Sequence, residues 1–443
     1  MAAQASTAVS NTASNAGTAL EPKKVSIAPL LKALCAPPPA CYKVPAEDVA
    51  LAFSRTFDNE LSSTQLASLL TLLCSTGQDK NPDVIARCAE AMRNAASPID
   101  LSQIQQVLGK RKRARGSYRG GLCDIVGTGG DSHSTFNIST ASSIAASAFL
   151  VMAKHGNRAQ TSMSGSADVL KAIEPRAPVL EALTAGHLSK AYEHSNYAFL
   201  LAPNFHSGMK YAATTRRELG LRTIFNLMGP LANPVDKLIE ARVIGVAYQE
   251  LGPIFAEALR VTGVTKAMVV CGMEDLDEIS CAGKTSCWWL KEKPNPKYQY
   301  REKLVEDEDA SDDEEREPEF ISELESFSIE PADFGLPRHS LSEVGGGKLP
   351  RENARVLVSL LTGQLDRDHP ILHFVLMNIA ALLVVSGVCD SDASDFGEVI
   401  TERGPGGGRW KEGLRLARLC IESGKAWDEF QKFVDLTNSL ASN

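Results

Sequence analysis

The sequence predicts an α/β protein with a small N-terminal α-helical domain and a large α/β domain built on a central, largely parallel sheet. Two observations lead to this class. Residues 25 to about 108 show helical periodicity with no strand-like run between the helices, whereas from Leu122 onward short apolar runs alternate with helical stretches. A chain of 443 residues is long enough to bury a core in both parts.

The N-terminal residues 1–24 are expected to form a disordered tail. They are rich in Ala, Ser and Thr and lack the positive start and apolar stretch of a secretory signal. The absence of Arg from the first 20 residues argues against a mitochondrial presequence. Ten Cys without a C-x-x-C pair, in a chain of this length, are typical of reduced thiols. We therefore expect a cytoplasmic protein, and the lack of an 18-residue apolar stretch predicts no membrane partner.

The helical domain is expected over residues 25–118. "AEDVALAFSRTF" repeats apolar residues at helical spacing, and "DNELSSTQLASLLTLLCSTG" offers Ser63 or Thr64 as a cap and Gly77 as a stop. Asn81-Pro82-Asp83 then begins another helix. Part of residues 185–235 is expected to join this domain.

The α/β domain is expected over residues 119–443. Its strands are predicted at "CDIVG", "FLVMAKHG", "YAFLLAP", "RVIGVAY" and "KAMVVCG". The basic stretch before it, residues 109–121, is interpreted as a solvated linker, with a nucleic-acid patch as the alternative. Residues 291–331 are charged and acid-rich, which predicts a disordered insertion.

The net charge of −8 comes from one segment. The run from Glu306 to Glu319 holds ten acids and one Arg, so the rest of the chain sums to about +1. A nearly neutral folded part predicts no general affinity for nucleic acid.

The stretch "DIVGTGGDSHSTFNISTA" from Asp124 to Ala141 combines a strand, a glycine loop and a polar helix start. Glycines let the backbone approach a ligand, and free N–H groups at a helix start bind phosphate oxygens. The loop is neither a P-loop nor G-x-G-x-x-G. The simpler interpretation of this stretch alone is a tight turn with an ordinary helix cap.

Three further polar clusters follow apolar runs. "AKHGNR" places Lys154, His155 and Asn157 after a predicted strand, and in a parallel sheet this loop would lie beside the glycine loop. "GMEDLDEIS" contains Asp277 and Glu278, which could hold Mg²⁺ together with substrate phosphates, although adjacent acids are also common on solvated surfaces. "RRELGLRTIFNLMGPLANP" contains three arginines, Arg216, Arg217 and Arg222, one of which would suit a carboxylate.

These four clusters, in this order, closely resemble the anthranilate phosphoribosyltransferase family of tryptophan biosynthesis. The resemblance runs from about residue 45 to the C-terminus, excluding the acidic insertion, and includes "GGGKLPRENA" and "VLMNIAALL". It implies a homodimer with a nucleoside phosphorylase/phosphoribosyltransferase-like fold. It also implies transfer of the 5-phosphoribosyl group from 5-phosphoribosyl-1-diphosphate (PRPP) to the amine of anthranilate, with Mg²⁺ as cofactor.

Carried over position by position, the resemblance assigns residues to three sites. The metal ligands would be Ser139, Asp277 and Glu278. The anthranilate positions would be Gly127, Asn157 and Arg216, with His155 beside them; Arg216 is preferred to Arg217 for its spacing from His206. The PRPP positions would be Gly127, Gly130, Asp131, Thr135, Asn137, Ser139, Thr140, Lys154, Ser162 and Ser166.

Three departures from the family pattern stand out. Asp275 and Glu174 replace usual glycines, and Ser207 follows His206 where Pro is frequent. None is an implied ligand, but the residues at 174 and 207 could shift loop geometry near the acceptor. The N-terminal tail and the acidic insertion are foreign to the family's core pattern.

The chemistry requires cleavage of the ribose C1–O bond while the diphosphate gains charge. Because anthranilate brings its own amine, we expect no covalent intermediate and no catalytic triad. Mg²⁺, Lys154 and backbone N–H groups would stabilise the leaving diphosphate, and His155 and Asn157 would orient the acceptor, with a proton-accepting role for His155 left open.

Two other functions would account for part of this pattern. A pyrimidine nucleoside phosphorylase would share the glycine loop and lysine but lack the paired "DE" and "RTIFNLMGPLANP". A non-catalytic relative that binds nucleic acid could use Lys110 to Arg115, but would not need Asp277 and Glu278.

Overall fold

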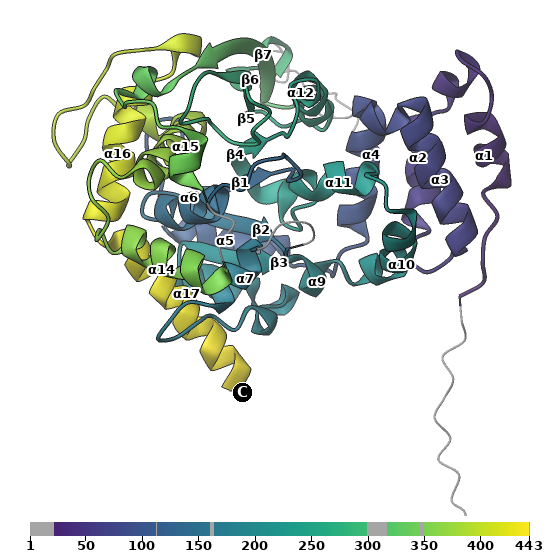
Figure 1. The fold of residues 1–443 in the computed structure, drawn as a ribbon, viewed down its shortest axis with the longest axis horizontal. Coiled ribbons are helices and arrows are strands. Elements are labelled where there is room, and N and C mark those ends of the chain that lie inside the picture. The colour runs from purple at the N-terminus through teal and green to yellow at the C-terminus, as the bar shows by residue number, and fades with distance from the viewer. Residues whose placement is uncertain (1–21, 112, 160–163, 299–316, 346–348, 443) are drawn as a thin grey trace, which may run out of the picture.

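The computed structural model describes residues 22–111, 113–159, 164–298, 317–345 and 349–442. A group of helices lies beside a larger unit in which helices surround a sheet (Figure 1). The predicted α/β class, with its helical N-terminal part, is confirmed. The N-terminal tail is described only from residue 22.

The N-terminal part begins with four helices, α1 (Ala28–Leu34), α2 (Ala46–Ser54), α3 (Ser63–Thr76) and α4 (Pro82–Asn94). The cap of α3 is Ser62, one residue before the predicted pair, and it accepts a hydrogen bond from the Gln65 N–H. The helix ends at Gly77, whose φ of +73° is the left-handed conformation that stops helices. Two later helices, α10 (Lys210–Leu219) and α11 (Ile224–Met228), pack against α3 and α4.

The α/β part contains one seven-stranded sheet in the order β3-β2-β1-β4-β5-β6-β7. The first five strands in the sequence are mutually parallel and match the five predicted runs, whereas β6 and β7 are antiparallel. The strands are β1 (Leu122–Gly127), β2 (Val151–Gly156), β3 (Tyr197–Leu201), β4 (Ile239–Gly245), β5 (Ala267–Gly272), β6 (Thr285–Pro294) and β7 (Phe320–Ile329).

This strand order places a topological switch point between β1 and β4. From β1 the chain runs outward through β2 to β3, and then returns to add β4 and β5 on the other side. The loops that follow β1 and β4 therefore run in opposite directions from the carboxyl ends of these two strands. Open α/β sheets bind ligands in the crevice that this creates. The glycine loop leaves the sheet at this point.

Helices cover both faces of the sheet. Alternate residues of β4 and β5 enter two different cores, with Val243 and Val270 on one face and Ile244 and Val269 on the other. On the first face α15 is apolar nearly all round and is buried from Ile371 to Ser386. The remaining helices of this part are α6 (Ile138–Ala146), α7 (Ser166–Lys171), α8 (Leu188–His194), α9 (Ala202–Phe205), α12 (Leu251–Val261), α14 (Pro350–Leu361), α15 (Pro370–Ser386), α16 (Trp410–Glu422) and α17 (Lys425–Ser442).

Helix α5 (Leu101–Arg111) departs from the expected domain boundary. Ile104, Val107 and Leu108 enter the core of the α/β part, and the helix packs against α8. The basic stretch 109–121, which begins at the end of this helix, is not simply solvated either, because Arg111 donates to the Tyr192 carbonyl and Arg119 pairs with Glu292. Local periodicity predicted a helix here, but only long-range contacts determine which core it joins.

The prediction that residues 291–331 form a disordered insertion is wrong at both ends. Its two ends form strands, because β6 and β7 pair along ten positions from Thr285–Ile329 to Pro294–Phe320. Lys291 and Lys293 face Glu325 and Glu323 across this hairpin, so part of the charge is paired rather than repelling. Residues 299–316, which hold most of the acidic run, lie outside the described residues.

Candidate active site

The glycine loop after β1 has two consecutive residues in the left-handed region. Gly129 has a φ of +66° and Gly130 a φ of +79°, conformations that favour glycine. Thr128 anchors the loop to β4, since its N–H donates to the Gly245 carbonyl (2.9 Å) and its Oγ1 accepts from the Ala247 N–H (3.1 Å). The loop is therefore held at the carboxyl edge of the sheet.

Asp277 lies directly against this loop, although 148 residues separate it from Gly129. Its Oδ2 accepts the Gly129 N–H at 2.7 Å. A Cβ on Gly127 would come within 2.4 Å of the same oxygen, and a Cβ on Gly245 within 1.5 Å of the Asp277 carbonyl oxygen. Glycine at both strand ends is thus what lets the carboxylate reach the loop.

Three carboxyl groups share this region. Burial, followed by the neighbouring Asp131, raises the pKa of Asp277, and burial also raises the pKa of Asp131. Burial, followed by the neighbouring Asp277 and Asp131, raises the pKa of Glu278. A hydrogen bond from the backbone N–H of Ser139 has the opposite effect and lowers it. Glu278 Oε2 is buried without a hydrogen-bond partner among the described residues. Crowded carboxylates of this kind favour a cation between them.

The start of α6 faces the glycine loop from the next segment. Asn137 is its N-cap residue but makes no capping hydrogen bond with its side chain. Instead its Nδ2 donates to the Ser164 carbonyl (3.0 Å) and its Oδ1 accepts from Asn353 (3.2 Å). The Thr140 hydroxyl donates to Ser166 Oγ (2.8 Å), which joins α6 to the start of α7.

Lys154 lies within β2 and is almost completely buried. Its Nζ donates to the Ile125 carbonyl of β1 at 2.7 Å. Burial lowers the pKa of this amine, while Asp124, Glu278 and Asp277 act in the opposite direction. The lysine therefore lies among the carboxylates of the site rather than at an open rim.

His155 points to the other side of β2 and meets His206 edge-on, with ring centroids 5.3 Å apart. Both rings are buried, and His206 Nε2 contacts the Ala232 carbonyl at 2.9 Å. Burial, together with His206 and Lys154, lowers the pKa of His155 to about 3. His155 Nε2 lacks a hydrogen-bond partner in the part of the chain that the structure describes. The ring is thus neutral near pH 7 and can still form one hydrogen bond.

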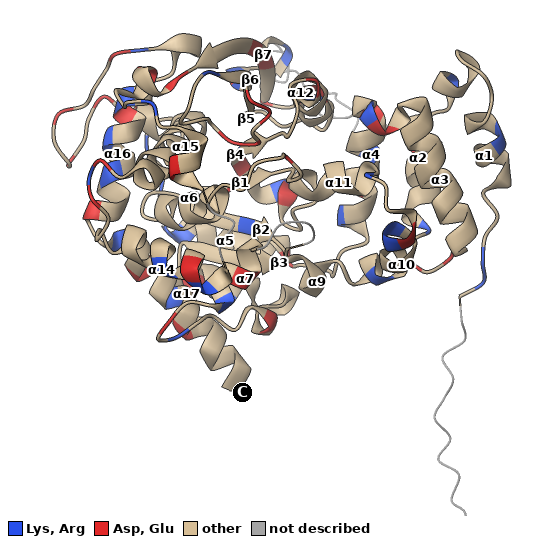
Figure 2. Cartoon of the chain, in the orientation of Figure 1, with Lys and Arg blue, Asp and Glu red and all other residues tan. Residues whose placement is uncertain are grey.

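Arg216 lies in the last turn of α10, a helix that carries several basic side chains (Figure 2). Its guanidinium stacks on Phe225 at 5.0 Å and is half-buried, and burial lowers its pKa. No carboxylate pairs with it among the described residues. A half-buried guanidinium without an anionic partner is suited to bind a carboxylate.

Comparison with known proteins shows the family of the chain. A family model described as the α/β domain of a glycosyl transferase family matches residues 119–310 and 316–427, and the helical bundle domain of that family matches residues 42–96. An anthranilate phosphoribosyltransferase from Schizosaccharomyces pombe is 36% identical over 391 residues, which are 88% of this chain and 92% of the relative. The chain belongs to the anthranilate phosphoribosyltransferase family.

Solved structures of this family have the same architecture. The Saccharomyces cerevisiae enzyme in complex with PRPP and Mg superposes with a TM-score of 0.71 at 29% identity, covering 94% of this chain and 99% of that one. The same enzyme in complex with 4-fluoroanthranilate gives a TM-score of 0.71 at 28% identity, with the same coverage.

The structure brings most of the residues predicted from the family resemblance to the carboxyl edge. Thr135 pairs with Gly345 beside the loop, and the Asn157 side chain accepts the Arg158 N–H just after β2. Ser162 lies outside the described residues. Asp275, which replaces a usual glycine, has a φ of +59°, which explains why glycine is favoured at that position.

Sequence reasoning misses two residues of this region. The sequence offers Arg222 only as a possible carboxylate ligand, but its guanidinium donates to the carbonyls of Gly130 (2.7 Å) and Gly129 (3.1 Å). Asn233 receives no role from the sequence, yet it is buried and its side-chain amide donates to Asp124 (2.9 Å) and to the Ala153 carbonyl (2.8 Å). Both residues belong to the motif "RTIFNLMGPLANP", which indicated that this segment contributes to the site but could not predict where each side chain points.

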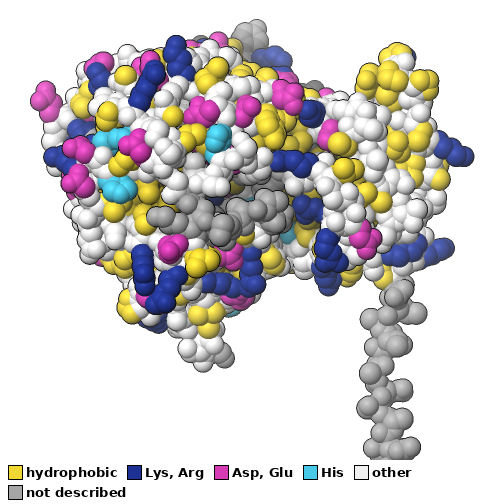
Figure 3. All heavy atoms as spheres, in the orientation of Figure 1, with side chains coloured by type: hydrophobic (Ala, Val, Ile, Leu, Met, Phe, Trp, Pro, Cys, Tyr) yellow, Lys and Arg dark blue, Asp and Glu magenta, His cyan; other side chains and the backbone are white. Residues whose placement is uncertain are grey.

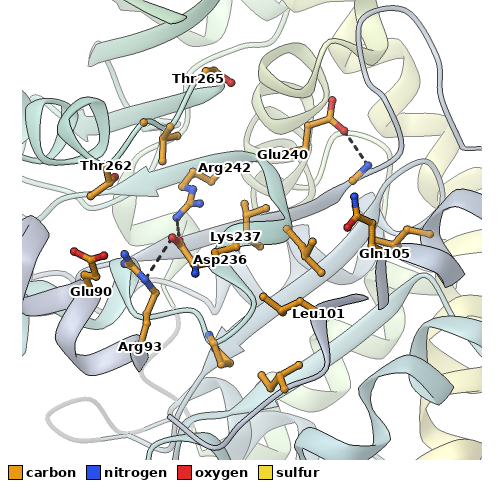
Figure 4. A pocket seen from close by; sticks show the side chains of 18 of the residues that line it. Glu90, Arg93, Leu101, Gln105, Asp236, Lys237, Glu240, Arg242, Thr262 and Thr265 are labelled. Atoms are coloured by element: carbon orange, nitrogen blue, oxygen red, sulfur yellow. Dashed lines mark hydrogen bonds and ion pairs between the residues drawn. The ribbon is translucent and has the colours of Figure 1, made fainter. Parts of the chain in front are cut away.

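A separate cavity of about 1140 Å³ lies at the opposite edge of the sheet, near the starts of β1, β4 and β5. It is lined by both parts of the chain, including Arg93 of α4 and Arg242 of β4 (Figure 4). These two arginines both point at Asp236, at 3.4 and 2.6 Å. Its charged groups are largely engaged with one another, so it gives no indication of a ligand.

The described residues contain neither a membrane-spanning helix nor a preformed metal cluster. No helix among them is long and apolar enough to cross a bilayer. No group of three or more His, Cys, Asp and Glu side chains within the described ranges is arranged to hold a metal ion by itself. The Asp277–Glu278 pair would therefore need ligands from a substrate to complete a coordination sphere.

Proposed function

We propose that the carboxyl edge of the sheet is where this enzyme transfers the 5-phosphoribosyl group from PRPP to the amine of anthranilate, releasing diphosphate, in tryptophan biosynthesis. The observation that carries this assignment is the contact between Asp277 and the Gly129 N–H. It joins a phosphate-binding type of loop to a pair of carboxylates at the switch point of the sheet.

The donor half of the site consists of the glycine loop and the start of α6. Backbone N–H groups and the side chains of Asn137, Thr140 and Ser166 face the same region and are suited to phosphate oxygens. Gly127, Gly130, Asp131, Thr135, Lys154 and Ser162 complete the proposed PRPP contacts.

Ser139, Asp277 and Glu278 would hold Mg²⁺. They fit the ion because Glu278 Oε2 is buried without a partner beside a second carboxylate, which is an oxygen-rich, negatively charged pair of ligands. When bound, Mg²⁺ supplies positive charge that offsets the charge gained by the leaving diphosphate. Lys154, close enough to influence both acids, offsets their repulsion.

The acceptor half of the site consists of Arg216, His155, Asn157 and Gly127. Arg216 supplies planar donors for the anthranilate carboxylate. His155 has too low a pKa to be an effective base near neutral pH, so it orients the acceptor through its free ring nitrogen. Exclusion of water and alignment of the amine with ribose C1 then account for catalysis.

The enzyme also forms a homodimer through its helical part. Three large apolar side chains, Val25, Tyr42 and Leu51, are exposed there, with Leu51 58% accessible. Hydrophobic side chains gather over the same end of the molecule (Figure 3). Exposed apolar side chains that gather on one part of a molecule are typical of a contact surface. We further propose that the enzyme is cytoplasmic and binds no nucleic acid.

The decisive experiment follows anthranilate fluorescence with PRPP and MgCl₂. Loss of fluorescence together with diphosphate release supports the assignment, and uridine plus phosphate serves as the control for a nucleoside phosphorylase. No consumption of anthranilate at high enzyme concentration would contradict it.

A further inference from the structure

Arg222 links the segment that carries Arg216, the proposed ligand of the acceptor carboxylate, to the glycine loop of the α/β part. It lies between α10 and α11, whose side chains Ala212, Ile224 and Phe225 enter the core formed by the N-terminal helices. Its guanidinium nevertheless extends to the glycine loop of the α/β part, where the two carbonyls of Gly129 and Gly130 accept its hydrogen bonds. Tyr248, which follows β4, lies beside the same group, with its ring centroid 5.9 Å from the guanidinium carbon.

These two hydrogen bonds determine the direction of the loop's N–H groups. In a planar trans peptide the carbonyl and the N–H point in opposite directions. Because Arg222 holds the carbonyls of Gly129 and Gly130, the N–H groups of Gly130 and Asp131 point away from it. Neither of these N–H groups donates a hydrogen bond within the described residues, so both are available to an anion.

The loop is held from two sides. Asp277 accepts the Gly129 N–H, while Arg222 binds the carbonyls that follow. Gly129 and Gly130, both in the left-handed region, have wide conformational freedom when unrestrained. The two hydrogen bonds from the planar guanidinium of Arg222 remove much of this freedom. The Arg222 guanidinium also packs so closely on Gly130 that a side chain there would not fit, since a Cβ on Gly130 would lie 1.8 Å from Arg222 Nη1.

We propose that Arg222 is a positioning residue that pre-orders the glycine loop for the diphosphate of PRPP. It acts through the backbone of Gly129 and Gly130 and adds positive charge behind the loop. Since Arg216 lies six residues earlier on α10, the same segment carries the acceptor's carboxylate ligand and the clamp on the donor loop. The proposal rests on the function given above.

The test measures PRPP affinity and both KM values in four proteins. Arg222→Ala is expected to raise the Kd for PRPP, measured by calorimetry with MgCl₂ and no acceptor, by about tenfold or more, and to raise the KM for PRPP similarly. The KM for anthranilate should change less than about twofold. Arg222→Lys should lie in between, because it keeps the charge but loses the planar fork. Arg217→Ala is the matched control, since Arg217 is exposed on the same helix and makes no side-chain hydrogen bond or ion pair among the described residues.

A double-mutant cycle adds a second measurement. Gly130→Ala should weaken PRPP binding in the wild type, and weaken it less in the Arg222→Ala background, where the guanidinium no longer occupies that space. Unchanged PRPP affinity in Arg222→Ala, or an equal rise in both KM values, would overturn the proposal. If the wild-type enzyme consumed no anthranilate, the proposed function would fail instead.

Discussion

At the scale of single residues, the site contains titratable groups whose pKa values are shifted by burial and by neighbouring charges. Lys154, His155, Asp277 and Glu278 are titratable groups removed from bulk water, and each has a shifted pKa. Such a concentration of shifted groups beside a ligand loop is typical of an active site.

The carboxylates at 277 and 278 should be needed for catalysis but not for folding. Asp277→Asn and Glu278→Gln each remove one ionisable carboxyl from a buried group of three whose pKa values are all raised, so thermal stability without metal should not fall. Turnover should fall by a factor of at least about 100, and the Mg²⁺ concentration required should rise, because a ligand beside the transferring phosphate is worth several kcal/mol. Turnover within about threefold of the wild type would place the metal elsewhere.

Arg216→Ala should act on the acceptor alone. The guanidinium has no carboxylate partner among the described residues, so its loss removes a ligand rather than an internal ion pair. The KM for anthranilate should rise about tenfold or more, and the KM for PRPP should change little. An equal rise in both constants would mean that the residue serves the donor or the fold.

His155 should make the protein sensitive to acid. Its pKa is lowered in the folded state from an ordinary value of 6.5 to about 3, so its stabilising contribution is present above pH 6.5 and is lost as the pH falls toward 3. The loss for this group amounts to about 1.4 kcal/mol per pH unit. Chemical unfolding between pH 7 and 4.5 should therefore show a shallower pH dependence in His155→Gln than in the wild type; identical slopes would show that the ring is protonated in the folded protein.

At the scale of elements, the β6–β7 hairpin extends the sheet without approaching the site. Leu290 of β6 pairs with Ala267, the first residue of β5, so the strand continues to Pro294 beyond the amino edge. The site lies at the carboxyl edge of the same strands. The charged segment joining β6 to β7 therefore leaves the sheet at the end opposite to the loop.

Removal of that segment should leave catalysis unchanged. We would delete residues 301–316, join the ends with a short Gly/Ser linker, and keep Asn295, whose side chain binds the Pro318 carbonyl at 2.8 Å. The kcat and both KM values should remain within about twofold, and stability should change by less than about 1 kcal/mol, since each doubling of loop length costs about 0.6 kcal/mol. A folded but inactive deletion variant would show that the segment takes part in the site.

At the scale of the whole molecule, two cores meet around the switch point of one sheet. The N-terminal helices share their core with α10 and α11, while the other face of the sheet packs on α6 and α15. Arg216, the proposed acceptor ligand, thus belongs to one part, and the glycine loop, the proposed phosphate site, belongs to the other. Under this proposal their relative position would determine whether the amine can reach ribose C1.

Assembly should depend on the outer face of the helical part. Leu51→Glu places a charge in the exposed apolar patch and should convert the dimer to a monomer in light scattering, without lowering the melting temperature of the monomer. Leu324→Glu is the matched control, because Leu324 is a partly exposed apolar residue on β7, far from that patch. A wild-type protein that is monomeric at micromolar concentration would contradict the proposed dimer.

The sequence by itself determined the features that depend on neighbouring residues. Apolar runs predicted all five parallel strands, Gly77 predicted the end of α3, and "GTGG" predicted a loop with little side-chain bulk. The order of the four clusters was enough to identify the family, and hence the reaction. These features follow from local periodicity and backbone conformation.

Only the tertiary structure decided how distant segments meet. It placed Asp277 against Gly129, directed Arg222 rather than Arg216 to the loop, assigned α5 to the α/β core, and paired the ends of the acidic insertion as strands. Each depends on contacts between residues far apart in the chain, where several partners of the same chemical type compete. Packing and burial choose among them, and neither can be read from the local pattern of residues.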